Sequence, residues 1–360
     1  MFATLSGSVL VCRGRRDSID GRGRRRQGGL MVSGGLPVEL PSAVEETVRA
    51  VFGVAGARWI DELPDVVAGL AERWGLGEFT APFGGGTHAY VAGARRDDGR
   101  QAVLKVPMVD EENIAEATAL YAYDGDGAVR LFEFDPATGA MLLEWAFPGT
   151  ELLTQPGFPS LEGRPENAVK VKSACELYRR LRRPAPALPD SFPAFPAATD
   201  VIDGLRTRLT DPAVAQAISP SLRTSVERWC VALSEPDGPL LIVNRDTHLG
   251  NIVAAEREPW LLIDPKPCLG EASFDAGFLL MIQIQSDPTP LHADAVIAAT
   301  AAALDVDPER ARGWALIRTV EELTWAVEDN DPQMRDLHAA VANALARLPF
   351  EQTPGRSTAE

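Results

Sequence analysis

Long apolar runs, clustered cysteines and histidines are all scarce in this chain. No apolar segment approaches the roughly 20 residues of a membrane-spanning helix, and no signal peptide with an adequate apolar centre is visible. Only four cysteines and four histidines occur among 360 residues, and the cysteines are scattered without the spacing of a zinc site or a disulfide framework. These absences argue against a membrane-embedded or disulfide-rich secreted protein, and we expect a cytoplasmic one with reduced thiols.

Basic residues are also in the minority. The chain has 35 Lys and Arg against 51 Asp and Glu, a formal net charge of −16. A protein that binds nucleic acid or an anionic membrane needs a positive face, so we expect neither as a partner. The charge is compatible with a small cationic substrate, although solubility alone would also explain it. The length and a hydrophobic share of 45% suit a globular protein of two lobes or one large domain, as a monomer or a homodimer.

Residues 1–30 differ in composition from the rest. They contain seven arginines, two aspartates and many glycines, without the period of a helix or a strand. The arginines follow the apolar stretch 5–11, whereas an export signal places its basic residues first. We therefore expect a disordered extension, with Met31 as an alternative start. A targeting or nucleic-acid-binding tail is the competing interpretation.

Residues 41–146 have the pattern of a small sheet with leading helices. Apolar residues at three- and four-residue spacing indicate helices, and short apolar runs bounded by turn residues indicate strands. The helices are expected at 42–52, 61–74 and 111–123, and the strands at 79–83, 87–94, 101–106, 128–133 and 141–145. We interpret this region as an N-terminal lobe.

Residues 147–350 are mostly helical by the same criteria. A Pro/Gly-rich stretch at 147–165 precedes helices expected at 166–181, 200–209, 219–233, 274–284, 293–304, 308–329 and 331–348, and 351–360 is expected to be a tail. The predicted fold class is therefore α+β, with a small antiparallel-sheet N-terminal lobe and a mostly helical C-terminal lobe.

The segment 240–267, LLIVNRDTHLGNIVAAEREPWLLIDPKP, carries the most informative pattern. Three short apolar runs read as buried strands that place Asp246, Asn251 and Asp264 at or after their ends. The spacing D-x-x-x-x-N is that of the catalytic loop in protein-kinase-like enzymes. There, the first carboxylate acts as the base, while the amide oxygen and the second carboxylate hold Mg²⁺ for ATP. Each residue alone is compatible with an ordinary turn, so the ordered set carries the prediction.

Two further residues in this region have open interpretations. Asp275 opens a predicted helix, and it either caps that helix or braces the catalytic loop. His248 lies inside the loop, and since no cysteine cluster pairs with it, packing within the loop is favoured over zinc binding.

The glycines Gly84, Gly85 and Gly86 lie between two predicted strands. Glycine lets the backbone approach a bound triphosphate closely, but such a triplet is also common in plain hairpins, and its spacing does not match G-x-G-x-x-G. Trp145 and Ala146 follow the predicted strand at 141–145. At a junction between lobes they would offer backbone groups to an adenine ring, although they also suit an ordinary strand end.

Lys105 and Glu116 have the arrangement of a phosphate-holding pair. Lys105 ends the predicted strand AVLKV, and Glu116 lies on the helix that follows. Kinases hold an ammonium over the α- and β-phosphates with such a strand lysine and helix glutamate. Glu111 and Glu112 are alternative partners for the lysine.

Taken together, these residues resemble the aminoglycoside phosphotransferase superfamily, and within it the streptomycin 6-kinase / hydroxyurea phosphotransferase branch. The resemblance covers about residues 59 to 348 and rests on AVLKVP, DTHLGNIVAAEREPWLLIDPKP and WALIRTVEELTWAVEDND, with the tetrad IDPK typical of the branch. It implies a protein-kinase-like bilobal fold and ATP-dependent phosphorylation of a hydroxyl. It also implies that Lys105 and Glu116 hold phosphates, that Asp246 is the base, and that Asn251 and Asp264 bind Mg²⁺.

One departure concerns Asn244 and Arg245, which stand where the family loop usually has His-Gly. The first hypothesis is still a kinase for an aminoglycoside- or aminocyclitol-type antibiotic, and a kinase for a sugar or amino alcohol is the alternative in the same class. A weakly active kinase-like binding protein is the alternative from another class, because the departure alters the loop beside the base.

Acidic residues near the end of the chain have two interpretations. They would meet a cationic substrate, or they form the solvated face of a helix. The residues are Glu321, Glu322, Glu328, Asp329 and Asp331.

Overall fold

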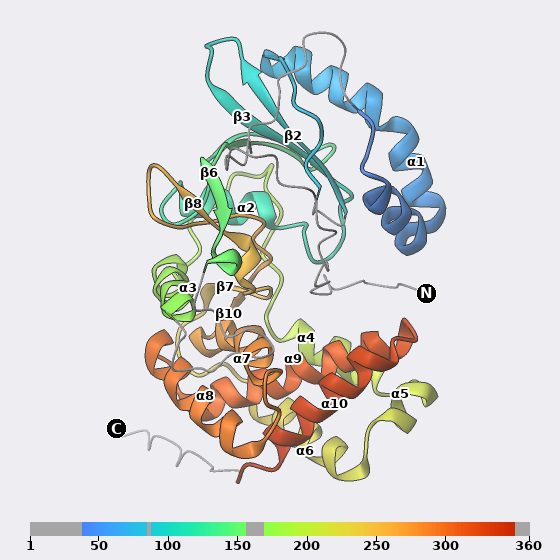
Figure 1. Ribbon diagram of the computed structural model, residues 1–360, viewed down its shortest axis with the longest axis vertical. Helices are drawn as coiled ribbons and strands as arrows, with labels where there is room; N and C mark the ends of the chain where they lie inside the picture. Colours follow the sequence, from blue (N-terminus) through green and yellow to red (C-terminus); the bar gives the residue numbers. More distant parts are fainter. Residues whose placement is uncertain (1–37, 85–87, 156–168, 350–360) are drawn as a thin grey trace, which may run out of the picture. The chain divides into compact units, whose positions relative to one another are not determined.

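The computed structural model describes residues 38–84, 88–155 and 169–349. The chain divides into two compact units (Figure 1). The first contains the described residues up to Val109 together with Phe132–Trp145, and the second contains Asp110–Leu131 and the described residues from Ala146 onward. The predictions for residues 1–30 and 351–360 lie outside the described residues.

The first unit is built on a five-stranded sheet of order β1-β2-β3-β5-β4. Its strands are β1 (Leu76–Gly77), β2 (Ala89–Arg96), β3 (Gln101–Pro107), β4 (Leu131–Asp135) and β5 (Ala140–Glu144). β3 pairs antiparallel with both β2 and β5, so that Lys105 lies opposite Val91 on one side and Met141 on the other. Lys105 is therefore on the central strand of the sheet.

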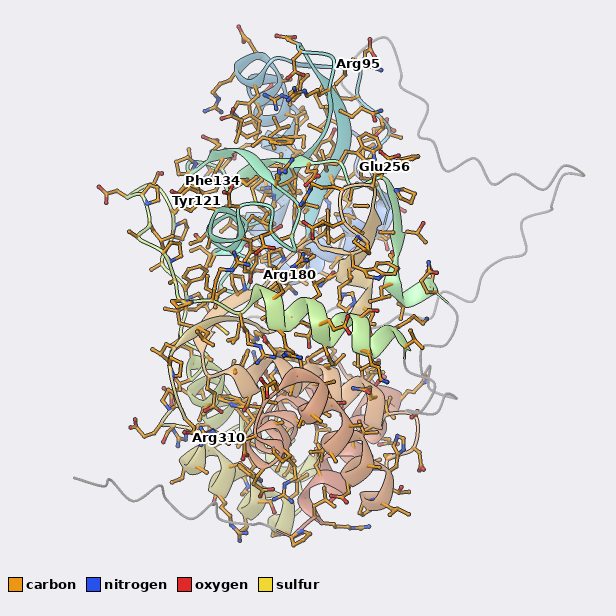
Figure 2. The ribbon with its side chains drawn as sticks, turned by 90° about the vertical axis from the view of Figure 1, so that its left-hand side faces the viewer. Arg95, Tyr121, Phe134, Arg180, Glu256 and Arg310 are labelled. Atoms are coloured by element: carbon orange, nitrogen blue, oxygen red, sulfur yellow. The ribbon has the colours of Figure 1, made fainter. Side chains whose placement is uncertain are left out.

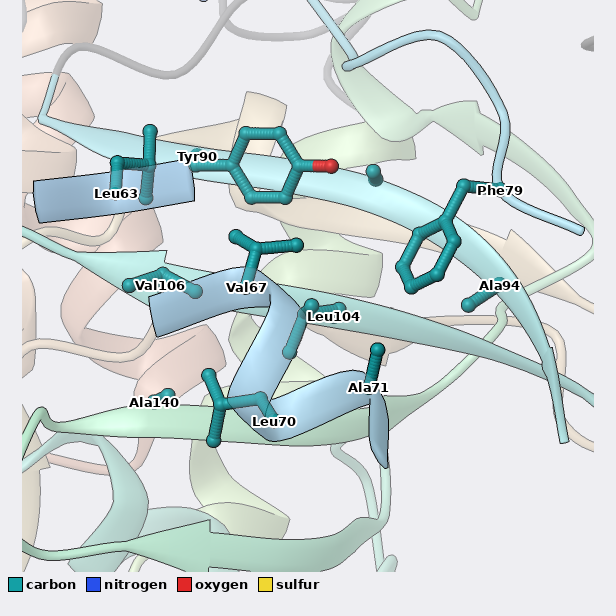
Figure 3. Close-up of a cluster of buried hydrophobic side chains, with 11 residues drawn as sticks. Leu63, Val67, Leu70, Ala71, Phe79, Tyr90, Ala94, Leu104, Val106 and Ala140 are labelled. Carbon is teal, nitrogen blue, oxygen red and sulfur yellow. The ribbon is translucent and has the colours of Figure 1, made fainter. Parts of the chain in front are cut away.

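Helix α1 (Ser42–Trp74) packs on one face of this sheet (Figure 3). Leu63, Val67 and Leu70 of the helix share a buried cluster with Tyr90 of β2 and Leu104 of β3. The three helix residues recur at spacings of four and three, the period that puts side chains on one helix face. This face and alternate residues of β2 and β3 make the core of the unit.

The two helices expected at 42–52 and 61–74 are one element. Residues between them are also helical, and only Gly53, with φ of 54° and ψ of −121°, departs from helical geometry. A Cβ on Gly56 would lie 2.4 Å from the carbonyl oxygen of Val48, so the kink brings the two helical stretches into close contact. Glycine at both positions permits this bend.

The second unit is mainly helical. Its helices are α2 (Glu116–Tyr123), α3 (Val169–Leu181), α4 (Asp200–Arg208), α5 (Pro212–Ala217), α6 (Pro220–Ala232), α7 (Ala276–Ile284), α8 (Pro290–Leu304), α9 (Pro308–Glu328) and α10 (Pro332–Ala346). Helix α9 is buried along most of its length and contacts α7, α8, α10 and α4 to α6. Arg310, labelled in Figure 2, and Trp314 Nε1 donate to the carboxylate of Glu271 at 2.7 and 2.6 Å, which fixes the start of α9.

A shared start signal explains where five of these helices begin. In α5, α6, α8, α9 and α10 a side chain caps the first turn and a proline follows it. The capping oxygen satisfies a backbone N–H at a gain of about 1 kcal/mol, and proline suits the first helical position because its missing N–H has no partner there. The sequence prediction missed α5, although Asp211-Pro212 carries this signal.

In the described part of the second unit, five short strands and three 3-10 turns accompany the helices. The strands are β6 (Pro148–Glu151), β7 (Leu241–Asn244), β8 (Ile252–Ala255), β9 (Leu261–Leu262) and β10 (Pro267–Gly270), and the turns are η1 (Leu152–Thr154), η3 (Leu249–Asn251) and η4 (Ala272–Asp275). β7 pairs with β10, and β6, β8 and β9 form a second small sheet. The three apolar runs of segment 240–267 are thus confirmed as β7, β8 and β9, whereas β10 was not expected.

Residues 110–131, expected in the first lobe, belong to the second unit. Residues 110–115 form a turn, so α2 starts at Glu116 and not at Glu111, and Thr118 of α2 donates to the carbonyl of Pro193. The strand expected at 128–133 is also wrong. Val129 N–H donates to Leu262 O, and only residues from Leu131 onward enter the sheet as β4.

The strand expected at 79–83 is absent from the described residues as a regular strand. Its backbone still follows β2, because Thr80 N–H donates to Gly93 O and Phe83 N–H donates to Val91 O. The α+β class itself is confirmed. Among the helices of the described residues, none combines the length and apolar character that a membrane span requires.

Candidate functional site

Lys105 lies on the face of the first-unit sheet opposite α1. Its neighbours Leu104 and Val106 belong to the apolar core, and successive strand residues point to opposite faces. Lys105 is nevertheless only 8% exposed. A buried lysine needs polar or charged groups around its ammonium. Its burial distinguishes Lys105 from an ordinary strand lysine, which faces solvent.

Trp145 covers part of the same face. A Cβ on Gly93 would lie 2.0 Å from the indole ring, so the tryptophan lies directly on the backbone of β2. The ring of Phe83 meets Trp145 edge-on, with centroids 5.7 Å apart. Gly84 follows Phe83 and is exposed, whereas Gly85 and Gly86 lie outside the described residues. Alternation along the strands thus puts Lys105 and the Gly93–Trp145 contact on one sheet face.

In the second unit, Glu116 is the first residue of α2 and is 1% exposed. Ala146 begins the part of this unit that follows the sheet, and it is partly buried. Glu116 is therefore buried, and Ala146 is partly exposed.

The loop after β7 brings Asp246 and Asn251 together. The Asn251 side-chain amide donates to Oδ2 of Asp246 at 3.3 Å. His248 accepts the N–H of Gly250 on Nδ1 at 3.0 Å, and its Nε2 is 3.8 Å from the same Asp246 oxygen. A Cβ on Gly250 would lie 2.6 Å from the imidazole, so glycine is required where the loop tightens. The favoured packing role for His248 is confirmed.

Asp264 is tied to this loop through the backbone. The N–H of Ile263 donates to the carbonyl of Asn251 at 2.8 Å, directly before Asp264. Asp264 has φ of +50°, a left-handed conformation that costs a non-glycine residue on the order of 1 kcal/mol and occurs often at functional sites. The strands therefore hold an amide and a carboxylate at neighbouring positions.

This donor set can be tested against a divalent cation. The described residues contain no cluster of three or more His, Cys, Asp or Glu side chains able to hold a metal by themselves. Mg²⁺ does not need such a cluster, because it commonly takes one or two carboxylates and completes its shell with phosphate oxygens and water. Asn251 and Asp264 fit Mg²⁺ bound together with a nucleotide, and they do not fit a protein-only metal site.

Asp275 holds the loop after β7 through hydrogen bonds to Asn244 and Thr247. Its carboxylate accepts the N–H of Asn244 at 2.7 Å and pairs with Nε of Arg182 at 2.9 Å, while its carbonyl accepts the hydroxyl of Thr247. Burial raises the pKa of Asp275 to about 6, against the opposing effects of Arg182 and the Asn244 N–H. It makes no side-chain cap to α7, so the bracing interpretation is confirmed and the capping interpretation is wrong.

The two residues that depart from the family pattern both have partners. The Asn244 side chain donates to the hydroxyl of Tyr123 at 3.2 Å, which joins β7 to α2. Arg245 contacts Glu321 at 2.5 Å and Glu112 at 3.3 Å, and it lies over the ring of Trp325. Both side chains therefore link the loop to elements around it.

Glu112 and Lys266 extend this network to the proposed base. Lys266 Nζ lies 3.5 Å from Glu112 and 3.6 Å from Oδ2 of Asp246. Burial would raise the pKa of Glu112, but Arg245, Lys266 and Arg318 together lower it to about 2. Burial likewise acts to lower the pKa of Lys266, and Asp246, Glu112 and other carboxylates outweigh it and raise that pKa above its usual range.

The acidic residues of α9 serve a purpose that neither sequence interpretation foresaw. Glu321 and Glu322 are 3% and 7% exposed, and both pair with Arg318. Burial, followed by repulsion from Arg245, lowers the pKa of Arg318 to about 10. The solvated-face interpretation is therefore wrong for both glutamates, and their charges are already balanced within the protein.

Sequence reasoning missed Arg318 and Lys266 as members of the site, and it considered Glu112 only as an alternative partner of Lys105. One usable signal was the α9 segment, where apolar residues occur on every side of the helix. A helix that is apolar all round is buried, and charges on it must then find partners.

The chain matches known proteins along most of its length. Residues 73–330 match the family model described as aminoglycoside/hydroxyurea antibiotic resistance kinase. A hydroxyurea phosphotransferase of Kitasatospora aureofaciens is 33% identical over 344 residues, which cover 94% of this chain and 93% of that protein. A streptomycin 6-kinase of Streptomyces griseus is 31% identical over 318 residues, covering 86% and 98%.

Solved structures are similar in fold at low sequence identity. An aminoglycoside phosphotransferase in complex with AMP-PNP and hygromycin B has a TM-score of 0.54 at 13% identity, covering 79% of this chain and 98% of that one. The choline kinase LicA from Streptococcus pneumoniae has a TM-score of 0.52 at 12% identity, covering 78% and 98%. The predicted protein-kinase-like fold is confirmed by these similarities.

Proposed function

The chain belongs to the aminoglycoside/hydroxyurea antibiotic resistance kinase family, and from this premise we propose that it uses Mg·ATP to phosphorylate a hydroxyl of an aminoglycoside- or aminocyclitol-type antibiotic. It is a phosphotransferase with a small-molecule acceptor. The nucleotide, the metal ion and the acceptor class are the proposed parts.

Asp246 is the proposed catalytic base. A carboxylate cannot deprotonate an alcohol in the ground state, so Asp246 orients the hydroxyl and accepts its proton late, as the bond to phosphorus forms. The observation that carries this role is the contact between Asp246 and Asn251 beside the backbone bond from Ile263 to Asn251. This contact supports the proposal, because it brings together the carboxylate and the amide of the D-x-x-x-x-N spacing.

The same arrangement supports assignments for nucleotide and metal. Asn251 and Asp264 would hold Mg²⁺, which supplies positive charge to the phosphates when bound. Lys105 and Glu116 are proposed to hold the α- and β-phosphates, and the buried position of Lys105 supports that role.

The adenine would lie at Trp145 and Ala146. The contact of Trp145 with the bare backbone of Gly93 supports this, because it fixes the indole on the Lys105 face of the sheet. Gly84, Gly85 and Gly86 are proposed as the loop over the phosphates.

The buried ion pairs of α9 affect which acceptor the site could recognise. Arg245 and Arg318 neutralise Glu321 and Glu322, so these two glutamates do not supply recognition of a cationic antibiotic. This favours keeping a sugar or amino alcohol as the alternative acceptor. The binding-protein alternative loses its motivation, because Asn244 and Arg245 brace the loop through their own partners.

The test is a product assay with the purified chain and Mg·ATP. Streptomycin, hydroxyurea, hygromycin B and a set of amino sugars are incubated separately, and phosphorylated products are detected by mass spectrometry. We expect a product that requires both ATP and Mg²⁺, with the highest kcat/KM for an aminocyclitol. A preference for a simple sugar would favour the metabolite kinase. No product from any acceptor, together with no binding of Mg·AMP-PNP, would overturn the enzyme proposal.

We also propose that the enzyme acts in the cytoplasm as a monomer or homodimer, without a nucleic-acid or membrane partner. The excess of acidic residues supports the last part of this proposal. Light scattering at assay concentration measures the oligomeric state directly.

A further inference from the structure

Lys266 is a cation held next to the proposed base, with no role assigned so far. Lysine is rare in this chain, which has only four among 360 residues. The loop between Asp246 and Asn251 reads Thr-His-Leu-Gly and contains no lysine or arginine. Lys266 reaches the base from the following strand connection instead, with its Nζ 3.6 Å from Oδ2 of Asp246.

The backbone of Lys266 is fixed against the same loop. Its carbonyl accepts the N–H of Arg245 at 2.8 Å, and the next residue, Pro267, pairs with Asn244 where β10 meets β7. The side chain therefore starts from a position registered to Asp246. A small displacement of the loop would carry Lys266 with it.

The far side of the ammonium is anchored by Glu112, 3.5 Å away. Glu112 is placed by the turn before α2, in which the Asp110 side chain accepts the N–H groups of Glu112 and Asn113 at 2.9 Å. Arg245 contacts the other oxygen of Glu112 at 3.3 Å. The ammonium thus lies between one anchored carboxylate and the carboxylate of the base.

The two oxygens of Asp246 have different surroundings. Oδ2 meets the amide of Asn251 and the ammonium of Lys266. Oδ1 is buried and has no hydrogen-bond partner among the described residues. Buried carboxylate oxygens normally have partners, so an unpartnered one at this position points to a donor supplied by a ligand. An acceptor hydroxyl is such a donor.

We propose that Lys266 is a positioning residue for phosphoryl transfer, holding Oδ2 of Asp246 so that Oδ1 receives the acceptor hydroxyl. This role rests on the proposed function. It acts through Asp246, because a base displaced by about 1 Å loses on the order of 100-fold in rate. The competing explanation is that Lys266 only neutralises Glu112 and keeps the fold together.

Three variants separate these explanations. Lys266→Met removes the charge at similar length, and Lys266→Arg keeps a cation. Lys170→Met is the matched control, because Lys170 is also a buried lysine of the second unit, and its Nζ donates to a neutral acceptor, the carbonyl of Leu153, at 2.8 Å. For each variant we measure kcat, KM for acceptor and ATP, and the thermal midpoint.

The proposal predicts that Lys266→Met lowers kcat about 100-fold with KM for the acceptor changed less than about threefold. Lys266→Arg should recover at least about a tenth of wild-type kcat, and Lys170→Met should keep it. Equal kcat for Lys266→Met and wild type overturns the role while the proposed function stands. A Lys266→Met variant that loses thermal stability and is not rescued by Lys266→Arg shows a structural role only, and also overturns it. A wild-type enzyme without any turnover overturns the proposed function and this role together.

Discussion

The interiors of the two units differ in chemistry. In the first unit, α1 covers the sheet with aliphatic and aromatic side chains such as Leu70 and Tyr90. In the second, α9 buries Arg318 and Glu321 directly under the loop that carries Asp246. The α1–sheet core gains stability from apolar burial, whereas the core around α9 keeps costly charges that are tolerable only in pairs. The comparison teaches that charge is buried where the loop must be held, and that this part of the protein should be sensitive to pH.

The largest stability effect is expected from Glu321→Gln. The change leaves Arg245 and Arg318 with too little opposing charge in a buried place, and the free energy of unfolding should fall by about 3–5 kcal/mol. Urea denaturation measures the loss. Glu328→Gln is the matched control on the same helix, because its partner Arg208 is 3.1 Å away and both side chains are partly exposed, so about 1 kcal/mol or less is expected. Equal losses for the two variants would contradict the buried-charge account.

A cavity in the first unit should act differently. Leu70 is 1% exposed in the α1–sheet core, and Leu70→Ala should cost about 2–4 kcal/mol through lost burial and a residual cavity. Because no titrating partner is involved, the loss should be equal at pH 5 and pH 7 in urea denaturation. A loss that depends on pH would break the contrast between the two interiors.

Unlike the loss from Leu70→Ala, the loss of unfolding free energy from Glu112→Gln should depend on pH. The pKa of Glu112 is about 2 in the folded protein against an ordinary 4.5, so its ionised form stabilises the fold above pH 4.5 and the contribution disappears as pH falls toward 2. The variant should lose on the order of 2 kcal/mol at pH 7, discounted for its partial exposure. Unfolding midpoints of both proteins from pH 7 to pH 3 should converge. Parallel curves would show that the charge of Glu112 is not what stabilises the loop.

The smallest effect is expected at the surface of the first unit. Arg49 and Glu45 pair at 2.9 Å across one turn of α1 with nearly half of each side chain exposed. Arg49→Ala should change the free energy of unfolding by about 0.5 kcal/mol or less, and high salt should abolish the difference. A loss comparable with that of Leu70→Ala would mean that distance alone, without burial, decides what an ion pair contributes.

The same contrast explains which features the sequence could predict. Apolar period and turn residues predict α8 to α10 and the runs that become β7 to β9, because these signals are local. The D-x-x-x-x-N spacing identifies Asp246 and Asn251 as candidates, and their contact is local because both lie within one tight loop. The bend at Gly53 and the start of α2 were mispredicted, because packing at Gly56 and the Asp110 turn decide them.

The partners of buried charges were beyond local patterns. No sequence pattern near Arg245 predicts its contact with Glu321, which lies 76 residues away. Glu112 and Lys266 are likewise far apart in sequence, and they meet where the Asp110 turn and the pairing of β10 with β7 place them. Such contacts follow from topology, and a prediction of them requires the fold first.

The most direct test of the central claim is the turnover of Asp246→Asn with the best acceptor and saturating Mg·ATP. If Asp246 is the base, kcat should fall by about 10³-fold, within the range that general-base catalysis contributes. Binding of Mg·AMP-PNP and the unfolding midpoint should remain close to wild type, since the amide keeps the size of the side chain. A variant that retains kcat within about tenfold of wild type would contradict the assignment of Asp246, and with it the account of the loop as the catalytic centre.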